Sequence, residues 1–153
     1  MELLAAILAG MLGTVAMTLS SGSEMHWTGR PESPAPGVAA VWPLKLVGLK
    51  VEGRALMVTS VWAHWAYGSA WGVAWWVLIA QAELPLALAA ATYFGIVWIT
   101  AVLLLRITGI APWPWKWGHI KYNLFDWTHH IAYVSGTVIG WVLSERVAGG
   151  AIL

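Results

Sequence analysis

The chain has 153 residues, of which 59% are hydrophobic and 10% are charged, and its net charge is +1. A soluble domain carries about 25% charged residues, so this composition indicates one integral membrane domain over residues 1–153. The small net charge argues against nucleic-acid binding. The absence of Cys excludes disulfides, thiolate metal ligands and Cys nucleophiles.

Four long stretches of the chain contain no Asp, Glu, Lys or Arg. They are Leu3–Leu19, Ala55–Ala82, Leu84–Leu105 and Trp127–Ser144. A helix needs about 20 apolar residues to cross a bilayer. The sequence therefore predicts an all-α membrane protein, a four-helix bundle. Its predicted spans cover about residues 3–22, 56–80, 85–107 and 124–147.

Small residues form two rows on the first predicted span. One row contains Ala6, Gly10, Thr14 and Thr18, and the other contains Ala5, Ala9 and Gly13. In lipid, small residues at four-residue spacing let helix backbones approach closely. We expect this helix to lie in the interior of the bundle.

The connections between the spans differ in length. Residues 20–54 include a Pro-rich break and then an apolar segment, about residues 36–50, that is too short to span and is predicted to be interfacial. The turn Gln81–Pro85 is short, so the second and third spans are predicted to be antiparallel neighbours. After the loop Thr108–Tyr122, Asn123 is the predicted N-cap of the last helix.

The second and fourth spans share a short pattern. His64 is followed by Tyr67 and then by two Gly residues four apart, and His130 is followed by Tyr133 and a similar Gly pair. Because both spans also run in the same direction, we interpret the pattern as a weak internal repeat. It suggests two similar helical hairpins.

Basic residues favour the side of the membrane opposite the termini. That side receives Arg30, Lys45, Lys50, Arg54, Arg106, Lys116 and Lys121. The side of the termini receives Arg146. The positive-inside rule then predicts a multi-pass protein with these loops in the cytoplasm and both termini outside.

From its second span onward the chain resembles the YagU-like family of small bacterial inner-membrane proteins. The resemblance lies in the His-bearing second span, in the turn with Glu83 and Pro85, in Gly109-Ile110-Ala111-Pro112, and in the aromatic final helix around Asp126–Tyr133. It implies location in the bacterial inner membrane and a topology, but no activity. Basic residues of that family favour the side of the termini, which implies the opposite orientation.

Ionisable side chains gather near one membrane boundary and form the candidate site. The predicted metal ligands are His64, His130, Asp126, Glu24 and His26. Imidazole and carboxylate groups suit Zn, Fe or Mn, and paired imidazoles also suit a haem or a chlorin pigment. In that case Tyr67 and Tyr133 would lie beside the bound cofactor. The same groups also suit proton transfer, or hydrogen bonding that only holds the bundle together.

Three functions remain open at this point. The favoured one is a structural or accessory component that packs in lipid as a homo-oligomer or with other membrane subunits. One alternative is a membrane protein that binds a metal, haem or pigment through His residues in electron or proton transfer. The other is a small transporter or channel. The chain contains no recognisable catalytic motif, so catalytic residues are unknown and a non-enzymatic role is favoured.

Overall fold

The computed structural model describes residues 2–82 and 84–150, with side chains described as far as Val147. Every regular element in this part of the chain is helical, which confirms the all-α prediction. The long elements are α1 (Glu2–Thr28), α2 (Ala35–Leu46), α3 (Gly53–Leu78), α4 (Leu86–Ile107) and α5 (Ile120–Gly150). Two short 3-10 turns, η1 (Ala80–Ala82) and η2 (Pro114–Lys116), precede α4 and α5.

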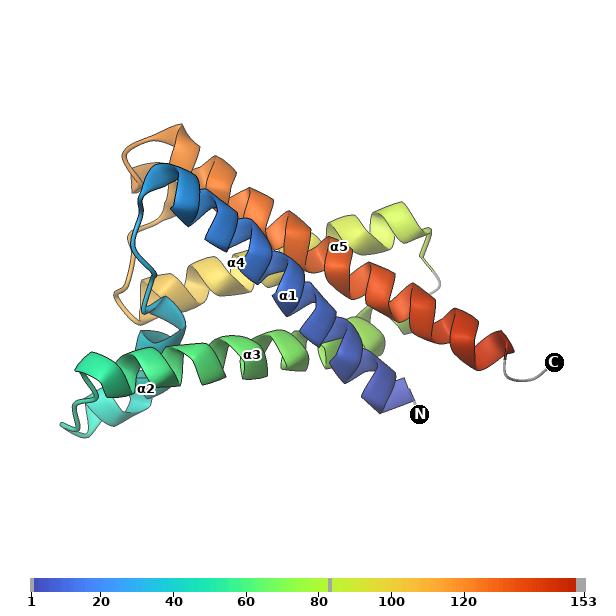
Figure 1. The fold of residues 1–153 in the computed structure, drawn as a ribbon, viewed down its shortest axis with the longest axis horizontal. Helices are drawn as coiled ribbons and strands as arrows, with labels where there is room; N and C mark the ends of the chain where they lie inside the picture. The colour runs from blue at the N-terminus through green and yellow to red at the C-terminus, as the bar shows by residue number, and fades with distance from the viewer. Residues whose placement is uncertain (1, 83, 151–153) are drawn as a thin grey trace.

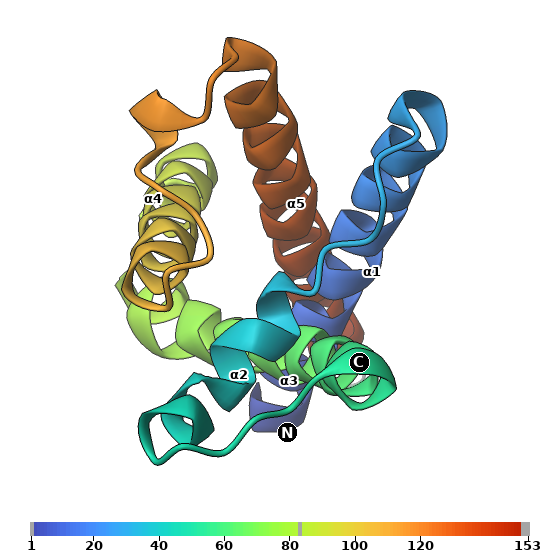
Figure 2. The same cartoon turned by 90° about the vertical axis from the view of Figure 1, so that its left-hand side faces the viewer.

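The four longest helices alternate in direction (Figure 1). Both termini and the connection between α3 and α4 lie at one end of the molecule. The other three connections lie at the opposite end, which we call the loop end. Figure 2 looks onto the loop end, where the shorter α2 lies at the edge of the molecule and packs mainly on α3. As predicted, α3 and α4 run antiparallel, and α3 and α5 run in the same direction.

By length and composition, two of the described helices, α1 and α4, are apolar enough to cross a membrane. They contain the predicted first and third spans. The predicted second and fourth spans fall on α3 and α5, which have 26 and 31 residues. Those two helices contain more Trp, Tyr, His and Gly and fewer aliphatic residues, which lowers their mean hydropathy.

Two helix boundaries differ from the predicted ones. α1 continues about six residues beyond the predicted span, to Thr28, whose hydroxyl donates to the Glu24 carbonyl at 2.8 Å. α5 begins at Ile120, so Asn123 lies inside the helix and is not its N-cap. The Asn123 side-chain amide instead donates to the Pro114 carbonyl at 3.2 Å and fixes η2 against α5.

Part of the predicted interfacial segment forms α2. The helix ends where the Leu49 N–H bonds to the Leu44 carbonyl at 3.0 Å and the Gly48 N–H bonds to the Lys45 carbonyl at 3.2 Å. Gly48 has a φ of 81°, so this is the left-handed Gly cap of a Schellman motif. Near its start, α2 packs on α3 at Gly37, where a Cβ would lie 2.6 Å from the Leu56 carbonyl oxygen.

Helix α1 packs closely on both α3 and α5. A Cβ on Gly10 would lie 2.5 Å from the Gly68 carbonyl oxygen and 2.9 Å from Gly72 Cα. On the other side, a Cβ on Gly136 would lie 2.9 Å from Gly13 Cα. These contacts confirm the predicted interior position of the first helix. They also show that α1 fills the space beside Gly68 and Gly72.

Candidate functional site

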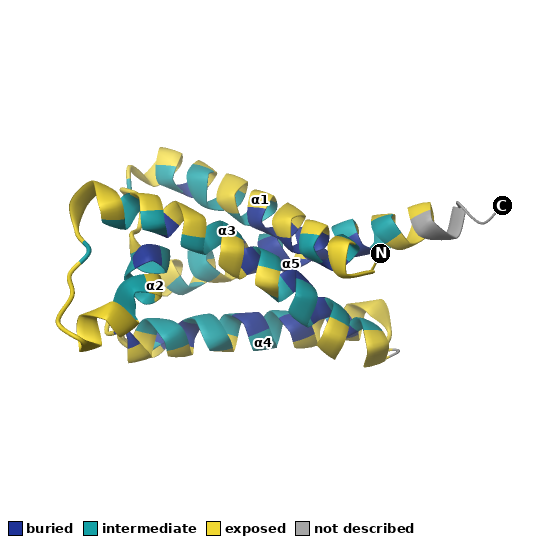
Figure 3. Cartoon of the chain, turned by 90° about the horizontal axis from the view of Figure 1, so that it is seen from below, coloured by how far each residue is buried: buried dark blue, intermediate teal, exposed yellow. Residues whose placement is uncertain are grey.

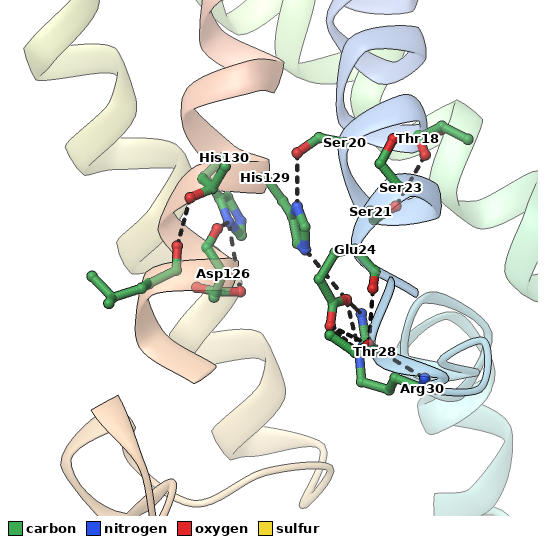
Figure 4. A network of polar contacts seen from close by, with 12 residues as sticks. Thr18, Ser20, Ser21, Ser23, Glu24, Thr28, Arg30, Asp126, His129 and His130 are labelled. Atoms are coloured by element: carbon green, nitrogen blue, oxygen red, sulfur yellow. Dashed lines mark hydrogen bonds and ion pairs between the residues drawn. The ribbon is translucent and has the colours of Figure 1, made fainter. Parts of the chain in front are cut away.

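A polar network joins the end of α1 to the start of α5 (Figure 4). Its central residue is His129 of α5, whose Nδ1 lies 2.9 Å from the Ser20 hydroxyl of α1. The other ring nitrogen, Nε2, lies 3.8 Å from a Glu24 carboxylate oxygen. Within the described part of the chain, Nε2 is buried and has no hydrogen-bond partner. Both contacts connect α5 to one face of α1, because Ser20 and Glu24 are four residues apart.

Glu24 is a buried carboxylate, only 6% exposed, and Arg30 lies against it. The guanidinium donates to one carboxylate oxygen from Nη2 at 2.6 Å and from Nε at 3.0 Å. The Thr28 hydroxyl donates to the other oxygen at 2.9 Å. Hydrogen bonds from Arg30, supported by the one from Thr28, hold the pKa of Glu24 below its usual value although burial opposes them. Glu24 lies beyond the predicted span at residues 3–22.

A second polar cluster joins α5 to α4. His130 Nδ1 lies 2.7 Å from the Asp126 carbonyl oxygen and 3.6 Å from the Asp126 carboxylate. The other carboxylate oxygen accepts a 2.7 Å hydrogen bond from the Trp98 indole. A carbonyl can only accept, so Nδ1 of His130 carries a proton and the neutral ring has an acceptor at Nε2. This tautomer is the one that many metal-binding His residues adopt.

His64 belongs to neither of these clusters. Its Nε2 lies 3.2 Å from the Thr18 hydroxyl, so it connects α3 to α1. The sequence assigned His64 and His130 to one candidate site, a shared pocket, but the structure gives the two imidazoles separate hydrogen-bond partners, Thr18 and Asp126. His26 is exposed.

The five predicted metal ligands are thus divided among separate places. Glu24 lies against His129, Asp126 against His130, and His64 against Thr18. Among the described residues, no group of three His, Asp or Glu side chains is arranged to hold a metal ion. Spacing along each helix predicted the end of the bundle at which these residues lie. It did not predict toward which neighbour each side chain points.

The two repeated Tyr residues also occupy different environments. Tyr67 is 39% exposed and its ring packs edge-on against Trp71. Tyr133 is buried, and its hydroxyl donates to the Gly68 carbonyl at 2.6 Å. Tyr93 of α4 similarly donates to the Trp71 carbonyl at 2.6 Å. Tyr133 and Tyr93 therefore join α5 and α4 to α3, and the predicted similarity of the two hairpins does not extend to their Tyr residues.

Four residues of these clusters are not among the predicted site residues: His129, Ser20, Arg30 and Trp98. A signal for them was present in the adjacent pair His129-His130. Neighbouring residues on a helix point about 100° apart. One ring of such a pair can face a neighbouring helix, as His129 faces Ser20 of α1, while the other lies beside its own helix, as His130 lies beside Asp126.

A hydroxyl, an imidazole and a carboxylate lie in a row here, from Ser20 through His129 to Glu24. Nucleophilic catalysis uses the same three groups in the same row. That chemistry also needs hydrogen-bond donors for a developing oxyanion. Ser20 lies inside α1, where backbone N–H groups bond to carbonyls four residues earlier. Arg30 already occupies the Glu24 carboxylate. What these contacts do supply is a hydrogen-bonded connection between α1 and α5.

No family model, no curated protein and no solved structure matches the chain. The resemblance to the YagU-like family stays a prediction. The function is therefore inferred from the packing and polarity of the chain itself.

Proposed function

We propose that the chain is a four-span membrane protein with a structural role, packing as an accessory component in an oligomer or a larger membrane complex. The observation that carries this proposal is the distribution of side-chain sizes. Among the described residues, the buried interior consists largely of aromatic and small side chains, such as Trp75, Tyr93 and Thr14. Most of the large aliphatic residues are exposed, and exposed positions occur along each of the long helices (Figure 3).

This outward pattern occurs on all four long helices. Exposed aliphatic residues include Leu4, Leu8 and Leu19 on α1, Val58, Val61 and Val77 on α3, Leu88, Ile99 and Leu103 on α4, and Ile131, Ile139 and Leu143 on α5. Monomeric soluble proteins rarely expose large continuous apolar patches. In lipid, exposure of such side chains has no hydrophobic free-energy cost, and close packing of small residues holds the helices together. The pattern thus supports membrane insertion of α3 and α5 as well as α1 and α4.

The arrangement of charges is compatible with this proposal. The seven basic residues that the sequence assigns to one side belong to α2, to the helix ends and to the connections of the loop end. We propose on the positive-inside rule that the loop end faces the cytoplasm and the termini lie outside. The inner membrane of a bacterium, implied by the resemblance, is the proposed location.

The oligomeric part of the proposal is supported by an uncovered surface on α4. Ala87, Ala91 and Gly95 form a row at four-residue spacing, like the rows of α1. A Cβ on Gly95 would meet no described atom within 4 Å. Beside Ala87 and Ala91, a shallow apolar groove separates α4 from Val134 and Ser135 of α5. The corresponding rows of α1 are covered by helices.

Cross-linking tests this proposal directly, because the chain contains no Cys. The variant Ala91→Cys should form a disulfide-linked species in native membranes if α4 packs against a second copy. If α4 packs against a different subunit, the Ala91→Cys variant should instead form an adduct of higher mass after treatment with a bifunctional thiol–amine reagent. Leu8→Cys on the outer face of α1 is the matched control and should remain uncross-linked. A monomeric mass in mild detergent, together with equal cross-linking of both variants, would contradict an oligomeric role.

A further inference from the structure

The turn between α2 and α3 exposes apolar and basic side chains together. Its four exposed large apolar residues are Leu44 at 41%, Leu46 at 66%, Val47 at 73% and Leu49 at 58% exposure. Lys45, Lys50 and Arg54 alternate with them and are also exposed. We call residues 44–54 the α2–α3 tip. Connections on a protein surface in water are usually polar, so this composition requires a different environment.

The conformation of the tip is set by its backbone. The Schellman motif at Gly48 ends α2 and reverses the chain toward α3. The close contact of Gly37 with α3 fixes the other end of α2. The exposed side chains of the tip therefore belong to an ordered turn, and this turn lies at the loop end (Figure 2).

We propose that the α2–α3 tip inserts into the membrane interface and binds the headgroups of anionic phospholipids. The inference rests on the proposed membrane function and adds a lipid class and a location to it. Apolar side chains of an interfacial segment enter the boundary between headgroups and acyl chains. Lys and Arg side chains extend their charged ends to the headgroup level while their methylene groups stay in apolar surroundings.

The charge of the tip decides which lipid it selects. Three cations, Lys45, Lys50 and Arg54, face solvent together with one carboxylate, Glu52. A basic residue close to an anionic membrane surface contributes roughly a fivefold preference. The excess of cations favours anionic over zwitterionic headgroups. The apolar residues between them favour a bilayer surface over a soluble anion, which offers no apolar phase.

The experiment uses the full-length chain in nanodiscs, with one environment-sensitive fluorophore on Val47→Cys. The natural absence of Cys makes this labelling specific. Quenching is compared between spin-labelled phosphatidylglycerol and spin-labelled phosphatidylcholine at equal mole fraction. We expect the anionic quencher to be severalfold more effective. The variant with Lys45→Gln, Lys50→Gln and Arg54→Gln should lose most of that difference.

A matched variant controls for net charge. Arg106→Gln, Lys116→Gln and Lys121→Gln remove the same charge from the same end of the molecule and should leave quenching at Val47 unchanged. Equal quenching by both lipids, or equal loss in the two variants, would overturn lipid selection by the tip. A label on Ile139→Cys of α5 separates this result from the proposed function. If Ile139 is quenched by lipid while Val47 is quenched only by aqueous iodide, the tip proposal fails and membrane insertion stands.

Discussion

Helices α1 and α4 both pack on α5, but by different means. The α1 interface is made of backbone contacts, in which a Cβ on Gly136 would lie 2.8 Å from the Leu12 carbonyl oxygen. The α4 side has an apolar groove in place of such contacts, together with the hydrogen bond from Trp98 to Asp126. Helix α1 thus joins α3 and α5 through close backbone contacts, whereas α4 leaves apolar surface exposed beside α5.

The largest expected effect comes from filling the α1 interfaces. Gly68→Leu places a side chain against Thr14, and Gly136→Leu places one against the backbone of α1. Thr14 is fully buried and has no free space to move into, and the backbone beside Gly136 cannot yield, so we expect each variant to lose about 3 kcal/mol of stability. Thermal unfolding in detergent measures this loss.

Gly95→Leu is the matched control on α4. Its Cβ enters open space among the described residues, so monomer stability should stay at the wild-type value. If the proposed docking of α4 holds, the same variant should reduce the oligomeric mass. Equal stability of all three Leu variants would contradict the proposed contrast between the close packing of α1 and the open surface of α4.

A smaller effect is expected from the buried Tyr hydroxyls that join α4 and α5 to α3. Tyr133→Phe removes the hydrogen bond to the Gly68 carbonyl, and Tyr93→Phe removes the one to the Trp71 carbonyl. Each carbonyl keeps its own helical bond, so the expected cost is about 1 kcal/mol. Chemical unfolding in mixed micelles measures it. Wild-type stability in both variants would show that these bonds do not hold the helices together.

The polar end of α1 should make stability depend on pH. Arg30 holds the pKa of Glu24 below its unfolded value, so ionised Glu24 stabilises the fold above that unfolded value. This contribution is lost as the pH falls through the lowered pKa of the folded state. Melting temperatures between neutral and acidic pH should show the loss, and Arg30→Gln should reduce it. A pH profile identical in the variant and the wild type would disprove the role of Arg30.

The smallest effect is expected for coupling between His64 and His130. Because His64 bonds to Thr18 and His130 to Asp126, their substitutions by Ala should add to within about 0.5 kcal/mol in a double-mutant cycle. Asp126→Asn with Trp98→Phe is the positive control, because those side chains share a hydrogen bond. Strong coupling of the two His residues would restore the shared pocket that the sequence predicted.

The sequence predicted the helices and their packing better than the site. Small residues at regular spacing, such as Gly10 and Gly13, identify close-packed faces because spacing along one helix is enough to define them. The direction in which His64 and His130 point depends on which helices lie beside them. The sequence could not show that α1 packs against both α3 and α5 and supplies Thr18 and Ser20 as partners.

The central claim is that the aliphatic faces of all four long helices contact lipid. Spin labels on Val61→Cys of α3 and Ile139→Cys of α5 test it most directly, because composition alone does not assign these two helices to the membrane. In nanodiscs, power saturation should show high accessibility to oxygen and low accessibility to a water-soluble nickel chelate at both positions. High accessibility to the chelate at both positions would contradict the account.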